Sequence, residues 1–148
     1  MPDKVIVDTS VLIALDKIDL LEVFCKIYGE IILPERVALE FGNLDLNCYK
    51  SIKVDNPLVN VLTNDLNLGR GESEVIALAY ESKNRALIDD LRARKIAGQL
   101  GVVFSGSLGV LLRAEKSGFI DSAYKKALEL RNKGFYISDG IIEDMKKQ

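Results

Sequence analysis

Two aspartates stand directly after short apolar segments. Asp8 follows the segment 5–7 (VIV), and Asp89 follows the segment 86–88 (ALI). Short β-branched and apolar runs of this kind predict buried strands. The carboxyl ends of central parallel strands meet at one edge of the sheet, so we expect the two aspartates to emerge close together.

Two glutamates are expected to join them. Glu72 opens a strongly apolar predicted helix over 72–83, and Glu40 lies at the far end of a predicted helix over 34–41. All four acids therefore fall at the same end of successive strand–helix units, which predicts one acidic pocket.

A cluster of carboxylates is typical of a site for a hard cation such as Mg²⁺ or Mn²⁺, which takes oxygen ligands. A metal held in this way can activate water and neutralise charge on a phosphoryl oxygen. The chain contains no histidine, which excludes Ser-His-Asp and Cys-His catalysis and the histidine zinc sites. Metal-aided phosphodiester hydrolysis fits this set of residues best.

Each acid alone also has a simpler interpretation. Asp8 and the Asp89–Asp90 pair precede predicted helices and could serve only as N-caps. Glu72 and Glu74 could merely complement a helix dipole, and Glu40 could be a solvated surface residue. Only the conjunction of the acids favours a metal site.

The composition indicates an ordinary globular protein. The 148 residues are 48% hydrophobic and 28% charged, which predicts a single domain over 1–148 with the helices of about 119–148 as an extension. The formal net charge of −2 excludes a global basic field that would attract nucleic acid. Cys25 is expected to be a small core residue, and a disulfide with Cys48 is not expected.

The localisation is expected to be cytoplasmic, without membrane contact. No apolar run approaches the roughly 20 residues of a membrane span. The first residues, MPDK, do not begin a basic and then apolar leader.

Strand and helix patterns alternate along the chain, which predicts the α/β class. We expect a central, mainly parallel sheet of four or five strands with helices on both faces. Thr9 and Ser10 are expected to cap the first helix. The expected strands lie at 4–8, 30–33, 58–62, 85–89 and 102–104. Helices are expected after the strands, and two more helices are expected at the C-terminal end of the chain.

Five motifs resemble those of the PIN-domain nucleases, in particular VapC-like prokaryotic ribonucleases. They are VIVDTS at 5–10, LPxxVxxE at 33–40, LGxGExExIALA at 68–79, LIDDxxAR at 87–94 and GSLGVLL at 106–112. The resemblance implies a Rossmann-like α/β/α sandwich and metal-dependent ribonuclease chemistry. It implies that the acids that hold the metal are Asp8, Glu40, Glu72 and Asp89, and that Ser10 and Ser107 line the pocket. Glu74 and Asp90 are possible substitutes, because the motif match leaves an ambiguity of one helical turn. Leu87 stands where many relatives have Thr or Ser.

The expected partners are an RNA substrate, a second copy of the chain at the C-terminal helices, and an antitoxin if the chain is a toxin. Basic residues near the acids are candidates for phosphate contacts, although they could equally be solvated surface charge. A catalytically silent PIN-like module that binds RNA or protein is the alternative function. The candidate basic residues are Arg70, Arg92, Arg94 and Lys95.

Overall fold

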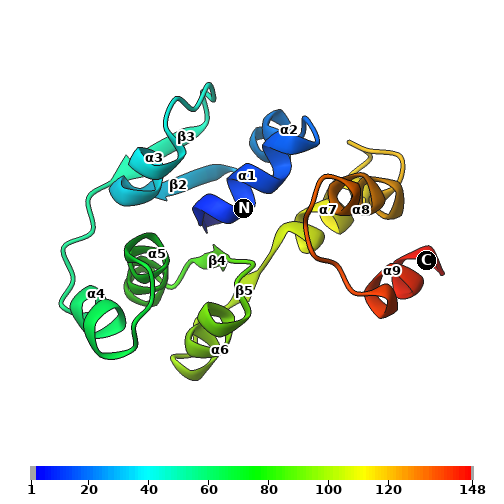
Figure 1. Ribbon diagram of the computed structural model, residues 1–148. Helices are drawn as coiled ribbons and strands as arrows, with labels where there is room; N and C mark the ends of the chain where they lie inside the picture. The colour runs from blue at the N-terminus through cyan, green and yellow to red at the C-terminus, as the bar shows by residue number, and fades with distance from the viewer. Residues whose placement is uncertain (1–2, 148) are drawn as a thin grey trace.

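A parallel sheet of five strands runs through the part of the chain that the computed structural model describes, residues 3–147 (Figure 1). Its order is β3-β2-β1-β4-β5. The order reverses beside β1, and ligands of parallel α/β sheets bind at such switch points, outside the carboxyl ends of the strands. The strands are β1 (Lys4–Val7), β2 (Glu30–Pro34), β3 (Tyr49–Ile52), β4 (Arg85–Leu87) and β5 (Phe104–Ser105).

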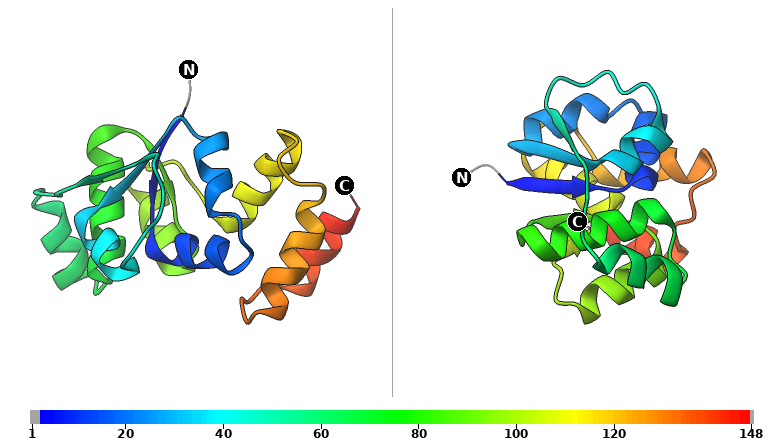
Figure 2. Two further views of the ribbon diagram at one scale, coloured as in Figure 1. Left: turned by 90° about the horizontal axis from the view of Figure 1, so that it is seen from above. Right: turned by 90° about the vertical axis from the view of Figure 1, so that its left-hand side faces the viewer.

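Helices cover both faces of this sheet. α5 and α6 lie on one side, and α1, α2 and α7 lie on the other (Figures 1 and 2). The predicted α/β sandwich is therefore confirmed. The helices are α1 (Thr9–Lys17), α2 (Leu21–Ile27), α3 (Glu35–Phe41), α4 (Leu58–Asn60) with a π-helical turn (Val61–Asp65), α5 (Arg70–Ser82), α6 (Leu91–Gln99), α7 (Ser107–Lys116), α8 (Ala123–Asn132) and α9 (Asp139–Lys146).

The hydrophobic core is continuous from the sheet to the C-terminal helices. α8 packs on α7 and α9 packs on α8, as a hairpin beside α1 (Figure 2). Apolar residues of this hairpin, among them Leu130, Ile142 and Met145, belong to the same buried cluster as the strands. Among residues 3–147 there is no helix with the length and apolarity that a bilayer crossing requires.

The strand predicted at 58–62 is wrong. This segment is helical, because Asn56 accepts a hydrogen bond from the backbone of Leu58 at 2.9 Å and Pro57 presets a helical φ. The strand lies earlier, at β3, where Ile32 pairs with Lys50. β3 is a partly exposed edge strand, so its apolar signal is weak.

The predictions for Thr9, Ser10 and the cysteines are also wrong. Asp8, not Thr9 or Ser10, occupies the N-cap position of α1. Cys25 is joined to Cys48 by a disulfide with a Cα–Cα distance of 5.6 Å. The backbone carbonyl of Cys48 accepts a hydrogen bond from Ile31 of β2, on which α2 packs, so β2 brings the two cysteines together.

Candidate active site

Asp8 is a buried carboxylate at the carboxyl end of β1. Val5, Ile6 and Val7 are fully buried, and Asp8 itself is only 4% exposed. Its backbone donates a hydrogen bond to the carbonyl of Leu87 at 3.0 Å, which continues the pairing of β1 with β4. The Asp8 side chain makes no capping bond to α1 and instead accepts a hydrogen bond from Ser10 Oγ at 3.2 Å. The cap interpretation therefore does not account for this carboxylate.

Glu40 reaches toward the same place from α3. Its Oε1 accepts a hydrogen bond from Thr9 Oγ1 at 3.3 Å. The same oxygen lies against Gly71 of α5, where a Cβ atom would overlap it. Glu40 therefore bridges the start of α1 and the start of α5, and glycine at position 71 provides the space for its carboxylate.

Glu72 lies in the first turn of α5 and is half-buried. Burial raises its pKa, and the charges of Asp90 and Glu40 raise it further. A hydrogen bond from the backbone of Gly69 and the charge of Arg92 act in the opposite direction. The hydrogen bond with Gly69, the N-cap residue, is half of a capping box, so Glu72 also helps to begin its helix.

The pKa of Asp8 shows that these acids act on one another. Burial raises it from 3.8 to about 6, and the charges of Glu72 and Glu40 add to the rise. Hydrogen bonds from the backbone of Thr9 and from the hydroxyl of Ser10 lower this pKa in part. An unpaired carboxylate with an elevated pKa beside other acids is typical of functional sites.

Asp89 lies at the same edge of the sheet, but its side chain is held by the chain itself. Leu87 of β4 is in register with Val7, which places Asp89 just past the strand end that adjoins Asp8. Its Oδ1 accepts a hydrogen bond from the Ser107 backbone at 2.8 Å, and its Oδ2 accepts one from Ser107 Oγ. A Cβ atom at Gly106 would come within 2.5 Å of Oδ1, so glycine there makes this contact possible.

The two candidate substitutes have different positions. Glu74 is 6% exposed and is occupied by other partners, because it accepts hydrogen bonds from Arg70 Nε at 3.0 Å and from the Arg36 backbone at 3.3 Å. Asp90 caps α6 by accepting a bond from Ala93 at 2.9 Å, yet its charge still raises the pKa of Glu72. Asp90 therefore belongs to the acidic region and Glu74 does not.

The basic residues predicted to contact phosphate lie in different surroundings. Arg92 donates hydrogen bonds to the carbonyls of Leu66 and Asn67, near enough to Glu72 to lower its pKa. Arg94 lies over the Phe104 ring at 4.9 Å, and Lys95 is exposed on α6. Of the four predicted contacts, Arg92 is the one whose charge acts on the acidic region, and Arg70 is paired with Glu74.

Sequence reasoning missed three residues that shape this region. Thr9 was expected only as a helix cap, but its hydroxyl binds Glu40. Gly71 and Gly106 give room to Glu40 and Asp89. A glycine directly before an acid or serine of a candidate motif is the signal that could have indicated them.

Comparison with protein families agrees with this arrangement. A family model described as a PIN domain matches residues 4–148. The chain belongs to the PIN-domain family. A comparison with curated proteins found no match. The PIN domain is a nuclease-type fold, and the predicted PIN-domain relationship is confirmed.

PIN domains typically use divalent metals, and the donor set of this PIN domain suits such an ion. The candidate ligands are carboxylate oxygens, which Mg²⁺ and Mn²⁺ prefer. Between residues 3 and 147, no three Asp, Glu or Cys side chains are arranged tightly enough to enclose a metal alone. Mg²⁺ commonly binds one or two carboxylates and keeps several waters, so buried Asp8 with Glu72 or Glu40 is a sufficient set.

Proposed function

We propose that this PIN domain is an endoribonuclease that hydrolyses RNA phosphodiester bonds with a divalent cation, Mg²⁺ or Mn²⁺. The observation that carries the proposal is buried Asp8, whose pKa is raised to about 6 by burial and by Glu72 and Glu40. Ionising this group in the folded chain is unfavourable without a counter-charge. A cation supplies that counter-charge, and its chemistry would be to activate water and stabilise negative charge on phosphate.

The residues have distinct roles in this proposal. Asp8 together with Glu72 or Glu40 would hold the ion, with Asp90 adding negative charge beside Glu72. Ser10 and Thr9 orient Asp8 and Glu40 through their hydroxyl groups. Ser107 fixes Asp89 through two hydrogen bonds, so that this carboxylate is presented in one orientation at the strand end.

The alternative is a catalytically silent module with the same fold. In a silent module, a buried carboxylate that forms no ion pair and is repelled by neighbouring acids would have no use, because such a group lowers the stability of the fold. The disfavoured charge on Asp8 therefore supports the enzyme over the module.

The test is cleavage of a mixed set of single-stranded and hairpin RNAs with Mg²⁺, with Mn²⁺, and with chelator. The parent is compared with Asp8→Asn and with Asp144→Asn, which removes an equal charge from an exposed position on α9. We expect cleavage only with metal, retained in Asp144→Asn and lost in Asp8→Asn. Cleavage that persists in chelator, or an Asp8→Asn protein as active as the parent, contradicts the proposal.

A further inference from the structure

A charged pocket lies beside the first turns of α5, lined on that helix by Arg70 and Glu74. It has a volume of about 300 Å³ and is formed by α3, by the segment after β3, and by α5. Three of its lining side chains are cationic: Arg36, Lys53 and Arg70. Two are acidic, Glu35 and Glu74, and Glu74 is already engaged by Arg70. The pocket therefore presents a net positive charge.

Buried Glu74 fixes one of these cations. It accepts a hydrogen bond from Arg70 Nε at 3.0 Å and another from the Arg36 backbone at 3.3 Å. Binding through Nε leaves the two terminal nitrogens of the Arg70 guanidinium available to a ligand, and this planar fork matches the oxygens of a phosphate. Arg36 and Lys53 form no ion pair within residues 3–147, so their charges are not neutralised by the fold.

The pocket shares two helices with the acidic region. Arg36 precedes Glu40 by one helical turn on α3, and Arg70 precedes Glu72 by two residues on α5. Residues four apart on a helix lie about 5–6 Å apart at their Cβ atoms. A nucleic-acid strand that reaches from the acids to this pocket would place a phosphate among its cationic side chains.

We propose that Arg36, Lys53 and Arg70 form a subsite for a phosphate of the RNA strand next to the phosphate that is cleaved. This inference rests on the proposed function and extends it, because it assigns the direction in which the strand leaves the acids. The group that the pocket would recognise is a phosphate, and a free phosphate ion is the other ligand that could supply it.

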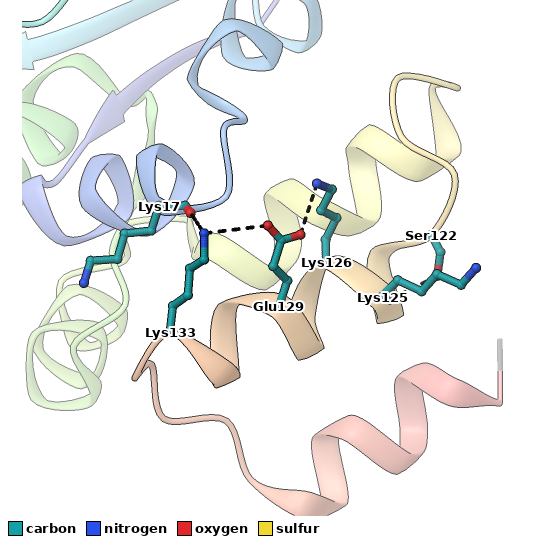
Figure 3. Close-up of polar contacts among 6 residues, drawn as sticks. All are labelled: Lys17, Ser122, Lys125, Lys126, Glu129 and Lys133. Carbon is teal, nitrogen blue, oxygen red and sulfur yellow. Dashed lines mark hydrogen bonds and ion pairs between the residues drawn. The ribbon is translucent and has the colours of Figure 1, made fainter.

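The test measures binding of a fluorescent single-stranded RNA mixture by anisotropy, in chelator so that no cleavage occurs, at several salt concentrations. The variants are Arg36→Ala, Lys53→Ala and the double variant. Lys125→Ala is the matched control, because Lys125 is exposed on α8 and points away from the Lys126–Glu129–Lys133 ion pairs (Figure 3). A second readout is the rise in melting temperature on adding Mn²⁺ or, separately, inorganic phosphate.

We expect the double variant to bind RNA about tenfold more weakly at low salt, with a salt slope smaller by about 0.7 for each lost contact. Lys125→Ala should bind like the parent, and all variants should keep the response to Mn²⁺. Unchanged affinity and slope in the double variant would overturn the subsite, as would a parent that does not bind RNA at low salt.

The two proposals fail in different ways. If the double variant cleaves RNA as well as the parent does, the proposed function stands and the subsite is overturned. If the parent binds RNA through these residues but never cleaves it, the subsite stands and the proposed function is overturned. If the variants lose stabilisation by inorganic phosphate but keep RNA affinity, the pocket binds a free anion, and the RNA assignment is overturned.

Discussion

Asp8 and Asp89 occupy equivalent places at the ends of adjacent parallel strands, yet the fold treats them oppositely. Asp8 is buried among other acids, and its pKa is raised to about 6. Asp89 has both carboxylate oxygens satisfied by Ser107. The strands determine where the two carboxylates lie, and contacts with other residues determine how well each charge is stabilised. Asp8 is therefore the less stabilised of the two carboxylates, and Asp89 is already held by hydrogen bonds within the chain.

The largest expected difference is in activity. Under the proposed function, Asp8→Asn should lower the rate of metal-dependent RNA cleavage more than about a hundredfold, because it would remove the buried charge that holds the cation. Asp89→Asn should lower it by about tenfold, because the backbone of Ser107 can still orient the amide oxygen. Initial rates at saturating Mn²⁺ measure both. Equal losses in the two variants would mean that the hydrogen bonds from Ser107 do not set Asp89 apart.

The next difference is in stability without metal. The pKa of Asp8 is about 6 in the folded chain against an ordinary value of 3.8, so its ionised form costs the folded state about 3 kcal/mol at neutral pH. Asp8→Asn should remove this cost and raise the free energy of unfolding by an amount of that order. Urea titrations of the parent and the variant in chelator measure it, and a destabilised Asp8→Asn protein would contradict the argument.

The same cost depends on pH. Between about pH 4 and pH 6, folded Asp8 binds a proton that the unfolded chain has released, so the parent gains stability as the pH falls through 6. The stability advantage of Asp8→Asn should therefore be full above pH 6 and disappear near pH 4. Comparing the two proteins at each pH cancels the titration of the other carboxylates. A pH-independent difference would rule out Asp8 as its source.

Removing the Asp89 carboxylate should lower the free energy of unfolding, whereas Asp8→Asn should raise it. Asp89→Ala leaves the backbone N–H and the hydroxyl of buried Ser107 without their acceptor. The unsatisfied donors should lower the free energy of unfolding by about 2 kcal/mol. Urea titration of Asp89→Ala beside Asp8→Asn is the measurement, and two variants that change stability in the same direction would contradict the comparison.

The sequence predicts the sheet and the placement of the acids better than their environments. Apolar segments ending in Asp8 and Asp89 indicate the strands because burial requires such runs, and the family motifs give their order. The half-exposed edge strand β3 has no such signal. The disulfide of Cys25 with Cys48 and the engagement of Glu74 by Arg70 depend on contacts between separate elements. Local pattern does not contain this information, so it could not show which acid stays unpaired.

The smallest expected effect concerns the hydroxyl beside Asp8. Ser10 Oγ donates a hydrogen bond to Asp8 Oδ2 at 3.2 Å, and this bond lowers the pKa of Asp8. Ser10→Ala should therefore raise that pKa above about 6, by less than about one unit, because burial remains the main cause of the rise.

The measurement is the pH at which the stability gain of the metal-free protein is half complete, which should move upward in Ser10→Ala. Ser107→Ala is the matched control, since it removes a hydroxyl of the same kind from Asp89 and should leave this midpoint in place while lowering stability by about 1 kcal/mol. A midpoint that moves in Ser107→Ala and not in Ser10→Ala would assign the titration to Asp89. Asp8 would then no longer be the acid that the fold leaves without a counter-charge.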